Sequence, residues 1–347
     1  MVSIVAVDLF CGVGGLTHGL QQSGINVVAG YDIDENCCLP YEENNNAEFI
    51  NKSIAELNID QLRSHFKASD IKLLAGCAPC QPFSNYTQGR PRDERWGLLS
   101  HFSRLASELM PDLITMENVP ELIKHDIFHE FIMTLTEQGY SVWYEVVYCP
   151  DYGIAQKRKR LVILASRLGP ISLIPATHKV DEYLTIKDVI GFLPELACGE
   201  VNGSDVLHRA AGLSEINLKR IKASKQGGTW KDWPEELLAN CHKKSTGKKY
   251  TSVYGRMHWN ELSPTVTTQF YNYGSGRYGH PTQQRAISLR EAAMIQSFPE
   301  SYKFTKETGI YSITSVARMI GNAVPVRLAK VIGDTLIAHV KAHGVEA

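Results

Sequence analysis

The first half of the chain alternates short apolar runs with segments in which apolar residues recur at helical spacing. The runs are rich in Val, Ile and Leu, as buried strands of a parallel sheet are. Segments of helical pattern lie between most of them, for example at residues 98–109. Such repeated β-α units predict a parallel sheet with right-handed crossovers. The predicted strands are residues 3–10, 25–31, 71–76, 112–117, 141–148 and 160–166.

This pattern stops near Pro170. From there to about residue 308 the chain is richer in Gly, Pro and Asn and has short irregular segments, which predicts a second, smaller domain with little regular structure. Helical patterning returns over residues 313–340, with a turn at residues 321–325 between two helices.

The composition of the chain indicates the size of its core and shows where charge is concentrated. The chain has 347 residues, 44% of them hydrophobic and 21% charged, which is enough for a large core and two domains. The formal net charge is −1, so no global basic field indicates nucleic acid. Residues 205–256, however, hold eleven Lys and Arg against five Asp and Glu. This segment suits contact with a polyanion, although charge alone is explained as simply by a solvated lysine-rich surface.

The eight cysteines form no metal framework. Cys77 and Cys80 make one C-x-x-C pair, but no second pair answers it at zinc-finger spacing, so we expect no metal site. A thioredoxin-like redox pair remains open from this motif alone. No apolar run reaches membrane-spanning length, and the N-terminus lacks the basic segment of a signal peptide, so we expect a reducing cytoplasm.

A glycine turn links the first predicted strand to the first helix. Glycines at positions 12, 14 and 15 let the backbone turn tightly and approach a ligand. Thr17 stands where the dinucleotide fingerprint has its third glycine, which disfavours a pyrophosphate ligand. Asp32 ends the second strand and can accept both hydroxyls of a ribose, and Ile33 can cover an adenine. NAD and S-adenosylmethionine both fit this half of the chain, and so does a plain structural turn.

Cys80 follows a buried strand and lies between two prolines on a stiff loop. Glu117 ends another strand, so both residues would lie at the carboxyl edge of a parallel sheet, where ligands bind. A thiolate could add to C6 of cytosine while the carboxyl group bonds N3 and the 4-amino group. A buried Cys and a helix-capping Glu are the ordinary alternatives. Arg158 and Arg160 alternate, so they could share one face and hold a carbonyl oxygen or a phosphate, unless they belong to a plain basic loop.

Six motifs follow one another along the chain. They are residues 10–15, Pro79-Cys80-Gln81, Glu117-Asn118-Val119, residues 156–160, residues 263–268 and residues 321–325. Together they resemble the cytosine-C5 DNA methyltransferase family of the prokaryotic restriction-modification type, over nearly the whole chain. A glycine turn alone would be weak support, whereas six ordered motifs are specific.

The resemblance implies an α/β fold. It consists of a doubly wound, Rossmann-like sheet of the S-adenosylmethionine-dependent methyltransferases and a second, smaller, irregular recognition domain. The last motif returns the chain to the cofactor, so the catalytic domain would be discontinuous, with residues 1–176 plus 309–347. Residues 177–308 would form the small domain, in which about 177–255 would read the DNA sequence.

The reaction implied is methyl transfer from S-adenosylmethionine to C5 of a cytosine flipped out of a specific duplex, with S-adenosylhomocysteine as product. Cys80 would bond to C6, Glu117 would hold N3 and the amino group, and Arg160 with Arg158 would support O2 and the loop. One position departs from the family, because Ser53 stands where an acidic residue often faces the adenine amino group. The residues implied for the cofactor are Phe10, Gly12, Gly14, Gly15, Leu16, Asp32, Ile33, Ser53, Ile54, Pro79, Leu98, Asn322 and Val324.

Double-stranded DNA is the implied partner. Glycines near Gln226 would allow close approach to a groove, and the lysines would meet phosphates. The residues expected at DNA are Gln81, Ser84, Gln226, Gly228, Thr229, Lys243, Lys244, Arg256 and Thr265. We further expect a monomer that uses no metal and no membrane, in the bacterial cytoplasm at the nucleoid, and a cognate restriction endonuclease could accompany it.

Three competing interpretations remain. The tRNA cytosine-C5 methyltransferases share the catalytic motifs, but their usual Cys-Phe-Thr signature is absent, and only Cys241-His242-Lys243 resembles it. A non-enzymatic relative would not need Cys80, Glu117 and both arginines. An oxidoreductase using Cys77 and Cys80 fits poorly with the missing third glycine and with Glu117-Asn118-Val119.

Overall fold

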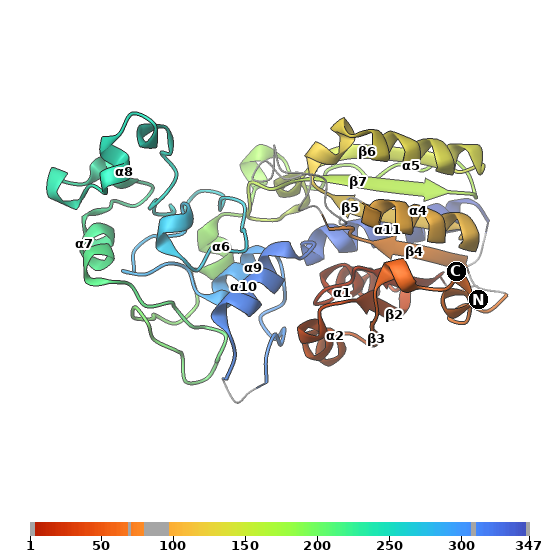
Figure 1. Ribbon diagram of the computed structural model, residues 1–347, viewed down its shortest axis with the longest axis horizontal. Coiled ribbons are helices and arrows are strands. Elements are labelled where there is room, and N and C mark those ends of the chain that lie inside the picture. The colour runs from red at the N-terminus through yellow and green to blue at the C-terminus, as the bar shows by residue number, and fades with distance from the viewer. Residues whose placement is uncertain (1–3, 69–70, 80–96, 307–309, 345–347) are drawn as a thin grey trace. The chain divides into compact units, whose positions relative to one another are not determined.

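The structure is a computed structural model that describes residues 4–68, 71–79, 97–306 and 310–344. The chain divides into two compact units. The first comprises Met1–Tyr152, Lys159–Thr177 and Ala323–Ala347, and the second comprises Gly153–Arg158 and His178–Asn322. Figure 1 labels most of the helices and strands of both.

The first unit is built on a seven-stranded sheet with the order β3-β2-β1-β4-β5-β7-β6. Its first five strands are parallel, whereas β7 runs antiparallel to both β5 and β6. The prediction of a parallel sheet is therefore wrong for β7. Only residues 149–158 separate β6 from β7, which is too short for the helical crossover that a parallel pair needs. The strands are β1 (Ile4–Leu9), β2 (Asn26–Asp32), β3 (Glu48–Asn51), β4 (Ile71–Gly76), β5 (Leu113–Asn118), β6 (Ser141–Tyr148) and β7 (Lys159–Ser166).

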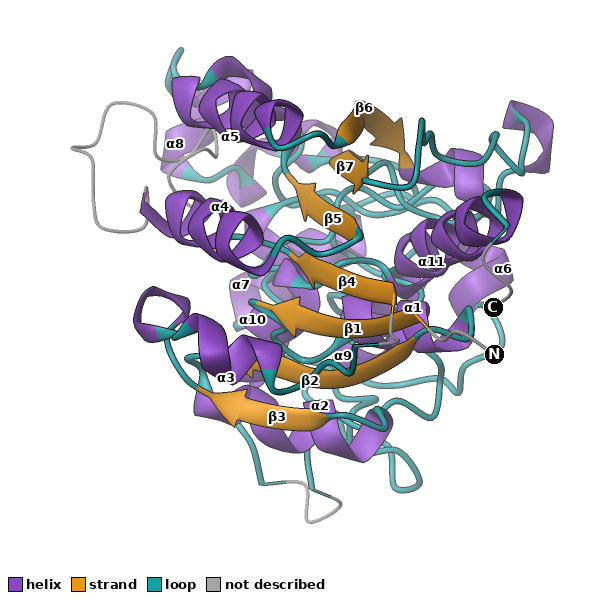
Figure 2. Ribbon diagram, turned by 90° about the vertical axis from the view of Figure 1, so that its right-hand side faces the viewer, coloured by secondary structure: helices purple, strands orange, loops and turns teal. Residues whose placement is uncertain are grey.

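Helices cover both faces of this sheet. Figure 2 shows α4 and α5 on one face and α1 and α11 on the other. Between the sheet and α4 and α5 lies a core that includes Phe102, Leu105, Phe128 and Phe131, all buried. On the other face α1 and α11 pack so closely that a side chain at Gly19 would collide with Ala329. The helices of this unit are α1 (Gly15–Gln22), α2 (Cys38–Asn44), α3 (Ile59–Arg63), α4 (Leu98–Leu109), α5 (Asp126–Glu137) and α11 (Val326–Ala342).

The second unit has short helices and isolated β-bridges, and its described residues form no named strand. A small aromatic core that includes Trp230, Trp233 and Tyr273 holds part of it together. One helix of this unit, α10, lies within the segment that the sequence analysis assigned to the catalytic domain from residue 309 onward. The helices are α6 (Ile186–Ile190), α7 (Glu215–Ala223), α8 (Asn240–Lys243), α9 (Leu289–Ile295) and α10 (Ile313–Asn322).

Candidate active site at the carboxyl edge of the sheet

The glycine turn after β1 has an unusual backbone. Phe10, Gly12 and Gly14 have φ values of 62°, 51° and 85°, in the left-handed region that favours glycine. A side chain at Gly14 would also collide with Asn45 and Tyr41. The turn therefore requires glycine at position 14, and it leads directly into α1, whose buried residues include Gly15 and Leu16.

Asp32 fixes the turn from the end of the neighbouring strand. Its Oδ2 accepts from the Gly12 N–H at 2.9 Å, and its Oδ1 accepts from the Asp34 N–H at 2.9 Å. Burial raises the pKa of Asp32 despite these bonds. The following side chain, Ile33, is 72% exposed and can cover a flat ligand. Ser53 is half-buried at the neighbouring strand end and accepts from the Ala55 N–H at 3.3 Å, and Ile54 beside it is buried.

Asp8, in β1 just before the turn, is a buried acid that the sequence did not single out. Its Oδ2 accepts from the Thr17 hydroxyl at 2.7 Å, and this hydroxyl is 3.0 Å from the Tyr41 hydroxyl. Its Oδ1 has no hydrogen-bond partner among the described residues. Burial raises the pKa of Asp8 from 3.8 to about 7. A carboxyl group in an otherwise apolar strand was the signal that could have singled it out.

Glu117 and Arg160 meet at the carboxyl edge of β5. Because β7 is antiparallel to β5, its first residues lie beside the last residues of β5. Arg160 Nε is 2.7 Å from Glu117 Oε1, and the side chains are 14% and 3% exposed. No described donor has good hydrogen-bond geometry to Oε1, so this contact is an ion pair rather than an aligned hydrogen bond. Cys77, directly after β4, places its thiol 3.0 Å from Glu117 Oε2.

The predicted nucleophile, Cys80, lies outside the described residues, as do Gln81 and Ser84. Two of the residues expected at the cofactor lie on either side of this part of the sequence. Pro79 is the last described residue after β4 and is half-buried, and Leu98 is the first residue of α4.

Arg158 occupies a different environment from Arg160. It precedes β7, so the alternation that predicted one shared face for the two arginines does not extend to it. Its guanidinium is buried and donates to the carbonyl oxygens of Val266, at 3.1 Å, and Gly321, at 3.4 Å. Thr265 belongs to the same cluster, because its hydroxyl donates to the Lys157 carbonyl at 2.7 Å. Arg158 thus connects residues 156–158 with residues 263–268 and the end of α10.

The remaining cofactor candidates lie in separate units. Asn322 is the exposed last residue of α10 in the second unit, whereas Val324 is buried in the first.

Most residues expected at DNA lie in the second unit, and they differ in exposure. Lys243 and Lys244 are exposed at the end of α8. Gln226 is exposed, but its Oε1 accepts from the Trp259 N–H at 3.0 Å. Thr229 lies next to Gly228 and uses its hydroxyl to cap the 3₁₀ helix Trp230–Asp232. The side chain of Arg256 is not on the surface, because the residue is 8% exposed and donates to the Gln283 carbonyl at 2.7 Å.

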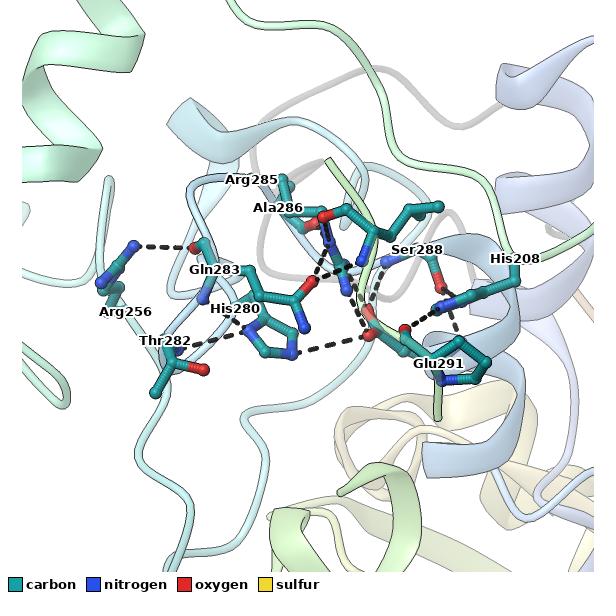
Figure 3. Close-up of polar contacts among 11 residues, drawn as sticks. His208, Arg256, His280, Thr282, Gln283, Arg285, Ala286, Ser288 and Glu291 are labelled. Carbon is teal, nitrogen blue, oxygen red and sulfur yellow. Dashed lines mark hydrogen bonds and ion pairs between the residues drawn. The ribbon is translucent and has the colours of Figure 1, made fainter. Parts of the chain in front are cut away.

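A buried polar cluster in the second unit also escaped the sequence analysis (Figure 3). Arg285 binds both oxygens of Glu291 at 2.7 Å, and the Ser288 N–H donates to Glu291 at 2.6 Å. Although burial alone would raise it, Arg285 lowers the pKa of Glu291 to about 2. His280 lies 3.6 Å from Glu291, and its burial lowers its pKa to about 4. The Ser-x-x-Glu spacing of residues 288–291, a capping box, was the available signal.

Two features are absent from the described residues. These residues hold no group of three or more His, Cys, Asp or Glu residues arranged for a metal ion. No helix within the described ranges has the length and apolar character needed to cross a membrane.

The fold and the turn after β1 define a Rossmann-like methyltransferase. Residues 4–338 match the family of C-5 cytosine-specific DNA methylases, and the chain belongs to that family. It is therefore a cytosine-C5 DNA methyltransferase, and the family and fold class expected from the sequence are confirmed.

Individual proteins agree with this assignment. The chain is 51% identical over 333 residues to the Type II methylase M.HgiDII of Herpetosiphon aurantiacus, covering 95% of this chain and 94% of the relative. It is 32% identical to the Type II methyltransferase M1.BsuMI of Bacillus subtilis, covering 94% and 79%. The fold is similar to that of the Entamoeba histolytica methyltransferase EhMeth, with a TM-score of 0.71, 18% identity, and coverage of 98% of this chain and 99% of the other.

Proposed function

We propose that this methyltransferase modifies one cytosine of a specific duplex DNA sequence as the methylating component of a Type II restriction-modification system. Relatives named Type II methylases or methyltransferases, which align along most of their length, support the system type. The observation that supports the chemistry is the buried pair of Glu117 and Arg160 at the sheet edge where β4 ends, shortly before Cys80 in the sequence. In the proposed arrangement, residues 1–176 and 309–347 perform the chemistry and residues 177–308 approach the DNA.

S-adenosylmethionine fits the residues around the glycine turn. The turn leaves open space for a ligand, because a Cβ atom added at Gly12 would meet no described atom within 4 Å. Asp32 presents a fixed carboxylate for ribose hydroxyls, and the exposed Ile33 suits an adenine face. When bound, S-adenosylmethionine supplies an electrophilic methyl group and leaves as S-adenosylhomocysteine.

The protein's own residues would activate the cytosine. The base must leave the duplex, because C5 and C6 are enclosed within the stack. The Cys80 thiolate adds to C6, and Glu117 bonds N3 and the 4-amino group, so that electron density gathers on C5. After methylation a base removes the C5 proton, the C5–C6 double bond forms again and Cys80 leaves as a thiolate. Arg160 keeps a positive charge beside Glu117 throughout.

Tritiated S-adenosylmethionine offered with DNA and with tRNA tests this proposal. We expect label in DNA, and mapping should place it on C5 of cytosine at one sequence. Cys80→Ser should abolish transfer, because a hydroxyl is a far poorer nucleophile at neutral pH. Label in tRNA alone would contradict the proposed substrate, and turnover by Cys80→Ser within about tenfold of the wild type would contradict the nucleophile.

Duplex DNA with 5-fluorocytosine at the mapped position tests the bond to C6. Fluorine cannot leave as a cation, so elimination stalls and the protein should stay attached to DNA. A cofactor-dependent band that survives denaturant is the expected result. Cys80→Ser is the matched control and should give no band.

A further inference from the structure

Cys77 belongs to a segment that three strands hold in place. Its backbone N–H donates to the Leu9 carbonyl of β1 at 3.2 Å. The next carbonyl, that of Ala78, accepts from the Asn118 side chain of β5 at 3.0 Å. The residue before, Gly76, packs closely against β1, since a Cβ there would lie 2.7 Å from the Leu9 oxygen. The backbone therefore sets where the Cys77 thiol lies.

The Cys77 thiol and Arg160 each contact a different oxygen of the Glu117 carboxyl group. Arg160 Nε is 2.7 Å from Oε1, and Cys77 Sγ is 3.0 Å from Oε2. A carboxylate that is only 3% exposed needs partners, because burying an unpaired charge is costly. Arg160 supplies the positive charge but no aligned hydrogen bond, so the thiol is the directed donor that the described residues give this group.

We infer that Cys77 is a positioning residue, whose thiol bonds to Oε2 of Glu117 and keeps this carboxyl group oriented while the cytosine is bound. This inference rests on the proposed role of Glu117 at N3 and the 4-amino group. Each oxygen of a carboxylate has two lone pairs, so Oε2 can accept from the thiol and from the 4-amino group of the base at the same time. Cys77 forms no bond to the substrate in this scheme, which separates it from a nucleophile and from a redox partner.

Substitutions at Cys77 distinguish a donor from mere packing. Cys77→Ala removes the donor and should lower kcat about 5- to 20-fold. The KM for DNA should stay within about twofold, because uniform binding is not affected. Cys77→Ser restores a donor of similar size and should recover kcat to within about threefold of the wild type. Wild-type kcat in Cys77→Ala, or an equal loss in Cys77→Ser, would overturn the inference.

The chain offers a matched control for removing a thiol. Cys38 in α2 places its Sγ 3.7 Å from Glu42 Oε2, so it also pairs a thiol with a glutamate. This pair is on the surface and away from the β4 and β5 ends, so Cys38→Ala should keep wild-type kcat and KM. A loss there equal to that of Cys77→Ala would show a general effect of cysteine removal and would overturn the inference.

A second measurement needs no enzymatic activity. The unfolding free energies of Cys77→Ala, Glu117→Ala and the double variant form a cycle that reports whether the two side chains interact. We expect the two effects to be clearly non-additive, and additivity within error would overturn the contact. If the wild-type protein transferred no methyl group to DNA, the proposed function would fail while this cycle still decided the contact.

Discussion

Whether a site residue could be predicted from the sequence depends on where its contacting residues lie along the chain. Glu117, Asp32 and Gly14 were proposed from the sequence because each stands at a strand end or in a tight turn. Such positions are recognised from the local pattern of apolar residues and glycines. Asp8 and Arg285 were missed, since what singles them out is burial beside residues distant in sequence, such as Thr17 or Glu291. A role that depends on tertiary partners has no local signature.

Asp8 should destabilise the folded protein at alkaline pH. Burial raises its pKa from 3.8 to about 7, so the protonated form is favoured in the folded state. The stability it contributes is fully present below pH 3.8 and is lost as the pH rises through 7. From the size of the shift, the loss approaches about 4 kcal/mol above pH 8.

Asp8→Asn tests this shift because an amide cannot ionise. Its unfolding free energy in urea should exceed that of the wild type at pH 8, and the difference should shrink towards pH 5. Asp60→Asn, at a side chain 80% exposed, is the control and should leave the pH dependence unchanged. Parallel pH curves for Asp8→Asn and the wild type would contradict the predicted ionisation.

Whole strands and helices were predicted more closely than their arrangement. Helix α4 has the predicted bounds, and the predicted strands agree with the observed ones to within about one residue. Strand β3 was not identified because only Phe49 of its four residues is buried, which leaves no apolar run. The direction of β7 was also missed, since periodicity within a strand says nothing about which way it pairs.

The N-terminus of α9 should depend strongly on Arg285. Its guanidinium neutralises Glu291, whose side chain is 1% exposed. Arg285→Met would leave that charge buried and unpaired, so we expect the unfolding free energy to fall by about 3–5 kcal/mol. Adding Glu291→Gln should recover part of this loss, because the amide still accepts from Ser288 but carries no charge. Denaturation in urea measures both.

An exposed pair provides the comparison. Lys330 and Asp334 are 2.7 Å apart, but their side chains are 42% and 39% exposed. Lys330→Met should therefore cost no more than about 1 kcal/mol. If Arg285→Met lowered the unfolding free energy by no more than this, the cluster around Glu291 would not be what stabilises the N-terminus of α9.

At the scale of the whole molecule, recognition of the family depended on motif order rather than on charge. The net charge of −1 gave no indication of DNA, and the local excess of lysine was open to an ordinary explanation. Six motifs in sequence identified the family that residues 4–338 match. The order of the motifs does not indicate which polar side chains of the second unit are exposed. Lys243 is exposed, for example, whereas Arg256 is buried.

The proposed recognition segment, residues 177–255, shares its core with residues beyond it. Ser224 links the two parts, because its hydroxyl accepts from the Trp233 indole at 2.7 Å and lies 2.8 Å from the Tyr273 hydroxyl. Tyr273 lies outside the segment. An exchange of residues 177–255 with a relative should therefore keep Ser224 and Trp233, so that the aromatic core still closes on Tyr273.

Such a chimera, built with a relative of different specificity, should methylate the sequence of the donor. The reason is that base contacts carry about 1–3 kcal/mol of discrimination each, while phosphate contacts only fix the register on the duplex. Mapping methylated cytosines in DNA from cells that express the chimera measures the outcome. A matched chimera that exchanges α5, on the first unit, should keep the original specificity. If the segment chimera is active but still modifies the original sequence, the bases are read outside residues 177–255, and the proposed division between chemistry and recognition is wrong.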